Sequence, residues 1–286
     1  MKPADTTMTD LGILELHIKA TTTQTITAHM GRAAQFACLQ AVRSQDDDLA
    51  QRLHDGHGLK PYTVSGLLQG ESSRSLNGII QPGAVGRIRF TSLSAAVFQV
   101  MGRWAAHSSA LELNHNQWEI TETRWKQTHS YADIITTHEL APPKEKINIR
   151  FTVPTCFKSM GQYFPMPTPR LVFGNLIDRW QAFSGVPVPT DFHDFVEQYI
   201  VVGDYDLRTQ PVVLKQGTQI KGCVGKVSYI IAKRNHTFEK NHPARATVVK
   251  QNRIALIRLT GMLAEFANYS GLGIKTTQGM GTVSIS

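Results

Sequence analysis

LGILELHIKATTTQTI, residues 11–26, is followed closely by MGRAAQFACLQAVR, residues 30–43. In the first stretch Leu14, Leu16 and Ile18 alternate with polar side chains, and this period of two predicts a β-strand. In the second stretch small apolar residues recur at helical spacing, which predicts an α-helix. A strand that leads directly into a helix is the expected beginning of an α+β domain.

The rest of the first half extends this pattern. Strand-like segments lie between residues 74 and 100 around the turn at Pro82-Gly83, and Ser94 is the predicted N-cap of a second helix. Residues 116–127 alternate again. The predicted order of the first half is therefore strand, helix, strands, helix, strand.

ELAPPKEK, residues 139–146, interrupts the periodic segments with two prolines and four charged residues. Such a composition is typical of a connection between folded parts of a chain. It predicts a domain boundary that separates residues 1–143 from residues 144–286, and each part is long enough to bury its own core.

The second half repeats the layout of the first without a matching sequence. Its predicted elements are a strand at INIRFTVP, a helix in LVFGNLIDRWQAF, two strand-rich stretches at 201–214 and 217–233, and a last helix near 253–268. The expected fold class is α+β, with two tandem ferredoxin-like (RRM-like, βαββαβ) domains.

The composition limits the classes of partner and cofactor. The net charge of +8 and the isoelectric point of about 9.5 favour a polyanionic partner, and nucleic acid is the commonest one. Cys38, Cys156 and Cys223 are odd in number and far apart, so neither a disulfide framework nor a zinc site is indicated. We expect no metal and no cofactor.

No targeting or membrane segment is expected. The first ten residues, MKPADTTMTD, lack an apolar signal core, and no run approaches the ~18 apolar residues of a membrane span. The expected location is the cytoplasm.

The stretch GLGIKTTQGMG, residues 271–281, contains Lys275 between two pairs of glycines, namely Gly271 and Gly273, and Gly279 and Gly281. It follows a predicted helix and precedes a strand, which is the reverse of the order around a Walker loop, and the Rossmann fingerprint fails the same test. Two interpretations remain from the residues alone. The glycines allow the main chain to approach a phosphate closely, or they serve a tight turn.

Four stretches together resemble one family of the RAMP superfamily, the CRISPR-associated endoribonucleases that cut precursor CRISPR RNA within its repeats. GLGIKTTQGMG is similar to the C-terminal glycine-rich signature of the superfamily. The other three resemble parts of that family: the start of the second domain, a first-domain stretch in which a Leu-His pair precedes a lysine, and a strand-rich insertion. They are FTVPTCFKSMGQYFPMPTPRLVFGNLIDRW (151–180), LAQRLHDGHGLKPYTVSGLL (49–68) and QIKGCVGKVSYII (219–231).

The resemblance implies a metal-independent cut in which the ribose 2′-hydroxyl attacks the adjacent phosphate. The products would carry a 2′,3′-cyclic phosphate and a 5′-hydroxyl. The protein then has to align the RNA, move protons and stabilise negative charge, tasks that suit histidine and lysine.

The resemblance also implies where the catalytic residues lie. His54 falls on the family's general-base position and Lys60 on that of its charge-stabilising lysine. Apart from the resemblance, His29, which precedes the first predicted helix, is a second candidate for the base. The alternative for His54 is a partly buried histidine that ends a helix. Where relatives carry a tyrosine or histidine in the first helix, this chain has Leu39 and Gln35. A subunit that binds CRISPR RNA without cutting it is therefore the alternative function.

The expected partner is CRISPR repeat RNA, as precursor and as mature guide, together with other CRISPR-associated proteins of an effector complex. A repeat hairpin would be held through its phosphates and its A-form shape, although any single lysine is as readily a solvated charge. Phe157 and Tyr163 are candidates to stack an unpaired base, although Phe157 is as readily a core residue. The candidate RNA contacts are the four glycines of residues 271–281, Lys275, Lys221, Lys226, Arg150, Lys158 and Arg32.

Overall fold

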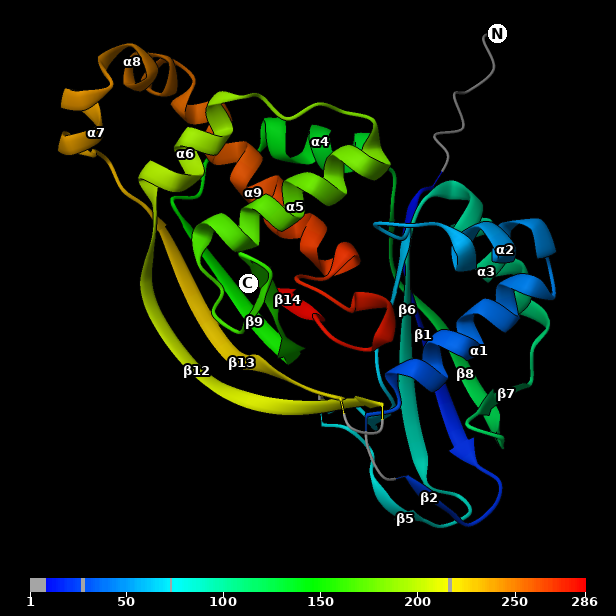
Figure 1. Ribbon diagram of the computed structural model, residues 1–286. Coiled ribbons are helices and arrows are strands. Elements are labelled where there is room, and N and C mark those ends of the chain that lie inside the picture. Colours follow the sequence, from blue (N-terminus) through cyan, green and yellow to red (C-terminus); the bar gives the residue numbers. More distant parts are fainter. Residues whose placement is uncertain (1–8, 27–28, 73, 216–217) are drawn as a thin grey trace, which may run out of the picture. The chain divides into compact units, whose positions relative to one another are not determined.

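A computed structural model describes residues 9–26, 29–72, 74–215 and 218–286. Most of the N-terminal stretch that lacks a signal core, residues 1–8, lies outside these ranges. The chain forms two compact units (Figure 1). The first contains Met1–Asp133 and Thr277–Gly279, and the second contains Ile134–Thr276 and Met280–Ser286. The boundary expected after residue 143 stays a prediction about domains.

The first unit is built on an antiparallel sheet around β1 (Leu11–Ala20). The strand order is β3 (Tyr62–Val64), β6 (Val85–Leu93), β1, β8 (Asn116–His129) and β7 (Ala110–Leu113), with β4 (Leu68–Gln69) also paired to β6. β2 (Gln24–Ile26) pairs separately with β5 (Gly78–Ile80). The stretch 11–26 is thus two strands in different sheets, not one.

Three helices complete the first unit: α1 (Gly31–Arg43), α2 (Asp47–Asp55) and α3 (Ala95–His107). Leu14, Leu16 and Ile18 share one buried core with the apolar faces of these helices, as their alternation predicts. Ser94 caps α3, because its hydroxyl accepts a hydrogen bond from the Val97 amide at 3.4 Å.

The second unit has a four-stranded sheet. Its order is β12 (Ile200–Lys215), β13 (Thr218–Ile231), β9 (Lys146–Thr155) and β14 (Val283–Ile285), and a short hairpin joins β10 (Phe157–Ser159) to β11 (Gln162–Phe164). The remaining helices are α4 (Tyr131–Leu140), α5 (Pro169–Ser184), α6 (Asp191–Tyr199), α7 (His236–Asn241), α8 (Pro243–Gln251), α9 (Arg253–Ser270) and the 3₁₀ turn η1 (Thr276–Gln278).

The two sheets share one topology. Each unit contributes four main strands and two helices in the order βαββαβ: β1-α1-β3-β6-α3-β8 in the first, and β9-α5-β12-β13-α9-β14 in the second. In both sheets the second strand is at one edge, followed by the third, the first and the fourth. This is the ferredoxin-like arrangement, so the predicted α+β fold class is confirmed.

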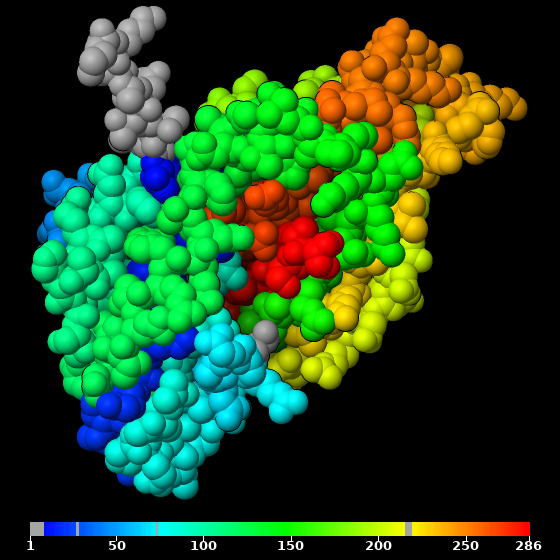
Figure 2. Space-filling model, turned by 180° about the vertical axis from the view of Figure 1, so that it is seen from behind, coloured from blue at the N-terminus to red at the C-terminus, as the bar shows by residue number. Residues whose placement is uncertain are grey.

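The core of the second unit lies where α5 and α9 pack on its sheet. The rings of Trp180 and Phe266 meet edge to face, 5.3 Å between centroids, and both side chains are buried. In the space-filling view the C-terminal residues (red) reach the surface beside α9 (Figure 2). None of the helices in the described ranges has the length and apolar character that a membrane crossing requires.

Candidate functional site

His54 lies on the last turn of α2, with 68% of its side chain exposed. Its Nδ1 is 2.8 Å from Oδ1 of Asp55. A carboxylate only accepts, so Nδ1–H is the donor and Nε2 of the neutral ring is the basic nitrogen. The bond from His54, joined by one from Gln51, holds the pKa of Asp55 below its ordinary value. Asp55 thus orients the imidazole, a role that was not predicted from the sequence.

Lys60 closes the turn that follows His54. Its ammonium donates to the carbonyls of Leu53 at 2.6 Å, of His54 at 3.5 Å and of Gly56. Burial lowers the pKa of Lys60. A cation on the terminal carbonyls of a helix stabilises its C-terminus, so the structure joins the two predicted residues through backbone contacts.

His29 occupies a different part of the first unit, just before α1. Its Nε2 is 2.8 Å from the carbonyl oxygen of Gln278, in the glycine-rich segment. Burial lowers the pKa of His29, and the bond to Gln278 partly opposes this. Since a carbonyl only accepts, Nε2 carries the proton and is engaged.

Gln35 also contacts the glycine-rich segment. Its side-chain amide donates to Oγ1 of Thr277 at 3.3 Å and to the hydroxyl of Tyr62 at 3.5 Å. Leu39, the other departure from the family pattern, packs against the core of this unit. Both residues therefore have structural contacts in this chain.

The segment Thr277–Gly279 fits into the first unit without room for a side chain at Gly279. A Cβ there would lie 2.5 Å from Nε2 of His29 and 2.8 Å from the Gly66 amide, and φ is +83°. Ser65 and Gly279 also form a parallel β-bridge. The glycine is needed for close packing and for its backbone conformation.

The base of the same loop is held inside the second unit. The Gly273 amide donates to Oδ1 of Asn175 at 2.8 Å, and Arg179 donates to the carbonyls of Gly273 at 2.9 Å and Ser270 at 3.1 Å. Arg179 is 4% exposed, and burial lowers its pKa to about 10. Its charge faces the carbonyl end of α9, where the helix dipole favours a cation. We name Asn175 and Arg179 the loop clamp.

Both clamp residues lie within the second-domain stretch 151–180, but no role was predicted for them. Their spacing of four places them on one helix face, which was the available signal. Gly271 and Gly281 also have positive φ and are buried, and Lys275, with φ of 58°, is exposed. The glycine-rich loop is thus packed on itself, with the Lys275 side chain exposed to solvent.

Two predicted RNA contacts lie side by side on the second sheet. Lys226 on β13 is directly opposite Arg150 on β9, and both are exposed. Asp206 is opposite Lys226 on the other flank. No ion pair of either cation occurs in the part of the chain that the structure describes. Like charges placed opposite each other on a sheet are unfavourable, so Arg150 and Lys226 together favour the binding of an anion.

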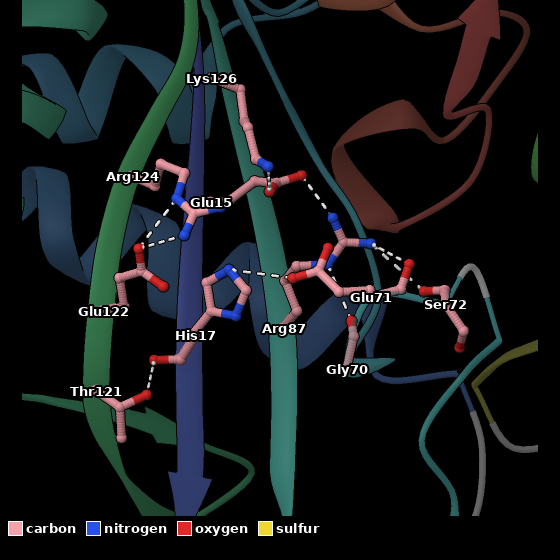
Figure 3. A network of polar contacts seen from close by, with 10 residues as sticks. All are labelled: Glu15, His17, Gly70, Glu71, Ser72, Arg87, Thr121, Glu122, Arg124 and Lys126. Carbon is pink, nitrogen blue, oxygen red and sulfur yellow. Dashed lines mark hydrogen bonds and ion pairs between the residues drawn. The ribbon is translucent and has the colours of Figure 1, made fainter.

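On the first sheet, by contrast, the face away from α1 and α3 carries cations that are paired with carboxylates (Figure 3). There the buried Glu15 pairs with Arg87 at 2.6 Å and with Lys126 at 3.5 Å, and Arg124 pairs with Glu122 at 2.5 Å. Each of these three cations is paired with a carboxylate of its own unit. They are poor candidates for binding phosphate.

The remaining predicted contacts are exposed but not gathered into these groups. Lys221 lies on β13, Lys158 on β10 and Arg32 on α1. Phe157 is buried at 2% exposure, so it is a core residue and not a stacking surface. Among the residues that the structure describes, no three His, Cys, Asp or Glu side chains are arranged to hold a metal ion.

Part of this chain matches the model of a known protein family. Residues 149–283 match the family described as CRISPR-associated endoribonuclease Cas6. The Streptococcus thermophilus protein of that name is 27% identical over 140 residues, which are 48% of this chain. A Mycobacterium tuberculosis Cas6 is 25% identical over 146 residues. The matches span only about half of these relatives or less, 49% and 40% of their lengths.

Solved structures extend the similarity of fold to nearly the whole chain. A Thermus thermophilus Cas6, solved as a product complex, has a TM-score of 0.75 at 22% identity and covers 97% of this chain and 99% of its own. A second Cas6, solved as a substrate mimic complex, has a TM-score of 0.70 at 19% identity, over 98% and 100% of the two chains. The resemblance to the CRISPR-associated endoribonucleases that the sequence predicts is therefore confirmed.

Proposed function

We propose that this chain binds CRISPR repeat RNA and cleaves precursor CRISPR RNA by metal-independent attack of a ribose 2′-hydroxyl on the adjacent phosphate. The observation that carries the proposal is the exposed His54 imidazole, oriented by Asp55 and held on a turn that Lys60 closes. The family match of the second unit and the fold of the Cas6 structures support it.

His54 is the group that accepts the 2′-hydroxyl proton. With Nδ1–H bonded to Asp55, Nε2 presents its lone pair to solvent, where a large substrate can reach it. As the proton arrives on Nε2, the Asp55 carboxylate stabilises the imidazolium, as a carboxylate does in hydrolytic triads.

His29 has a structural part in this proposal. Its Nε2–H is donated to Gln278 and its ring is half-buried, so it holds the glycine-rich segment instead of meeting the ribose. Lys60 supplies positive charge next to the His54 turn. Its bonds to carbonyls in the free protein mean that it must exchange one of them to reach a phosphate.

The decisive experiment incubates the purified protein with the repeat RNA of its own host in EDTA and identifies the product ends. The expected products carry a 2′,3′-cyclic phosphate and a 5′-hydroxyl. Loss of cleavage in EDTA that magnesium restores would contradict the mechanism. Tight binding without any cleavage would instead support the non-cutting, guide-binding subunit.

The RNA surface has a separate test. Arg150→Ala and Lys226→Ala should each weaken repeat binding and reduce the salt dependence of log K by about 0.7–0.9 for every phosphate that the variant no longer neutralises. Arg124→Ala is the matched control, because Glu122 already neutralises that cation. An unchanged slope in the first two variants would show that this face does not meet the RNA.

A further inference from the structure

Helix α5 contains a glycine that the fold itself does not require. Gly174 lies inside the helix, where glycine is less favourable than alanine. A Cβ at this position would meet no heavy atom within 4 Å. Its φ is not in the left-handed region, so neither backbone strain nor internal packing explains the missing side chain.

Gly174 faces a pocket of about 260 Å³ on the second unit. The wall around it combines cations with amide and carboxylate groups of α5 and the base of the glycine-rich loop. Lys158, Gly174 and Asp178 are among its lining residues. Arg170 at the rim is paired with Glu197 at 3.3 Å, which leaves Lys158 as the available cation among the residues that line this pocket.

The β10–β11 hairpin places an aromatic ring beside that cation. Tyr163 is 51% exposed and lies directly opposite Lys158, whose Nζ is 6.0 Å from the ring centroid. All three residues of β11 are exposed. An exposed ring next to a cation is the combination that binds single-stranded nucleic acid, with a base on the ring and a phosphate on the cation.

We propose that the hairpin and the Gly174 face of α5 form a subsite for a single-stranded segment of RNA. An unpaired base stacks on Tyr163, its phosphate meets Lys158, and the sugar-phosphate chain passes over α5 at Gly174. Asp178 is exposed and accepts hydrogen bonds from exocyclic amines of a base. This subsite rests on the RNA-binding function proposed above, and it specifies that this surface binds RNA in single-stranded form.

The first test uses Gly174→Ala and the matched control Gly102→Ala. Gly102 lies inside α3, and a Cβ there would only touch Trp125 at 3.9 Å, an ordinary contact. Both variants should raise Tm by about 2 °C through helix propensity. Only Gly174→Ala should weaken binding of a short mixed-sequence RNA carrying a 3′ fluorescein, by at least about fivefold in fluorescence anisotropy. Equal affinity of Gly174→Ala and wild type overturns the subsite.

The second test compares Tyr163→Ala with Tyr163→Phe on the same oligonucleotide. Loss of stacking should weaken binding about 5- to 150-fold in the alanine variant, while phenylalanine keeps the ring and the affinity. A wild-type protein that does not bind the oligonucleotide, or an alanine variant that binds normally, overturns the subsite. Cleavage of hairpin repeat RNA is followed separately, so failure of the nuclease function is recognised independently.

Discussion

Two histidines of the first unit, His54 and His29, are in opposite situations. His54 is largely exposed at the end of α2, and its Nε2 is available to a substrate. His29 is half-buried, donates through Nε2 to Gln278, and leaves no space for a Cβ at Gly279. The same side chain is thus placed once for chemistry and once for holding a distant segment. The two roles differ in how exposed the imidazole is and in whether its Nε2 is already engaged in a hydrogen bond; the residue type is the same.

The largest expected effect concerns catalysis at the first of these positions. His54→Ala should lower single-turnover cleavage of repeat RNA by about 10²–10⁴-fold, since that is what a positioned base contributes. RNA affinity should stay nearly unchanged, because many phosphate contacts remain. Cleavage rate and Kd are measured together, with His29→Ala in parallel. If His54→Ala cuts normally and folded His29→Ala does not cut at all, the two roles are exchanged.

A smaller effect is expected on the packing around His29. Gly279→Ala adds a Cβ 2.5 Å from Nε2 of His29 at a φ of +83°, so it should lower the free energy of unfolding by about 2–4 kcal/mol. Urea denaturation followed by circular dichroism measures it. Gly161→Ala is the control, because its φ is +78° with no heavy atom within 4 Å. Equal losses of unfolding free energy in the two variants would show that the positive φ alone, and not the contact with His29, causes the effect.

The turn after His54 should be less sensitive. Lys60→Met removes the donor to the carbonyls of Leu53 and Gly56, and we expect a loss of about 1 kcal/mol in unfolding free energy. Lys144→Met, at an exposed lysine of the α4–β9 connection, should change it by less than about 0.5 kcal/mol. A Lys60 variant as stable as the Lys144 control would show that the carbonyl contacts are not needed for folding.

The smallest effect is a dependence of stability on pH. Burial lowers the pKa of His29 in the folded protein, so between that lowered value and the ordinary value of about 6.5 the unfolded chain binds more protons. His29 therefore contributes stability above pH ~6.5 that is lost as the pH falls through this window. His29→Gln should show a shallower fall in unfolding free energy on acidification. Identical slopes in the two proteins would show that His29 is not a buried neutral group.

Much of the fold was predictable because its signals are local. Alternation in 11–20 and 147–154, helical spacing in 30–43 and the cap at Ser94 each involve neighbours in sequence, and the structure contains those elements. The polar stretch near 233–245 has the composition of a loop, but it forms α7 and the start of α8. Its cap was the missed signal, because Asn235 accepts from the Phe238 amide at 3.0 Å.

The site was less predictable, since its contacts join residues that are far apart in sequence. The resemblance indicated His54 and Lys60, but not that Lys60 binds the carbonyls beside His54. Nothing local indicates that Gln278 accepts from His29. Arg179 has the composition of a surface residue and is buried, because helix and loop carbonyls from about ninety positions further on surround its charge.

The path of the chain through Thr277–Gly279 has a consequence for synthesis. His29 and Gln278 are 249 positions apart, and all the strands and helices of the second unit except β14 are made between them. Since a ribosome releases the N-terminus first, the first unit emerges without Thr277–Gly279 and receives them only after all of the second unit except its last residues, Met280–Ser286, has been translated. Closing so long a loop is a late, slow kind of step in folding. The hydrogen bond between His29 and Gln278 can therefore form only after translation has passed residue 278.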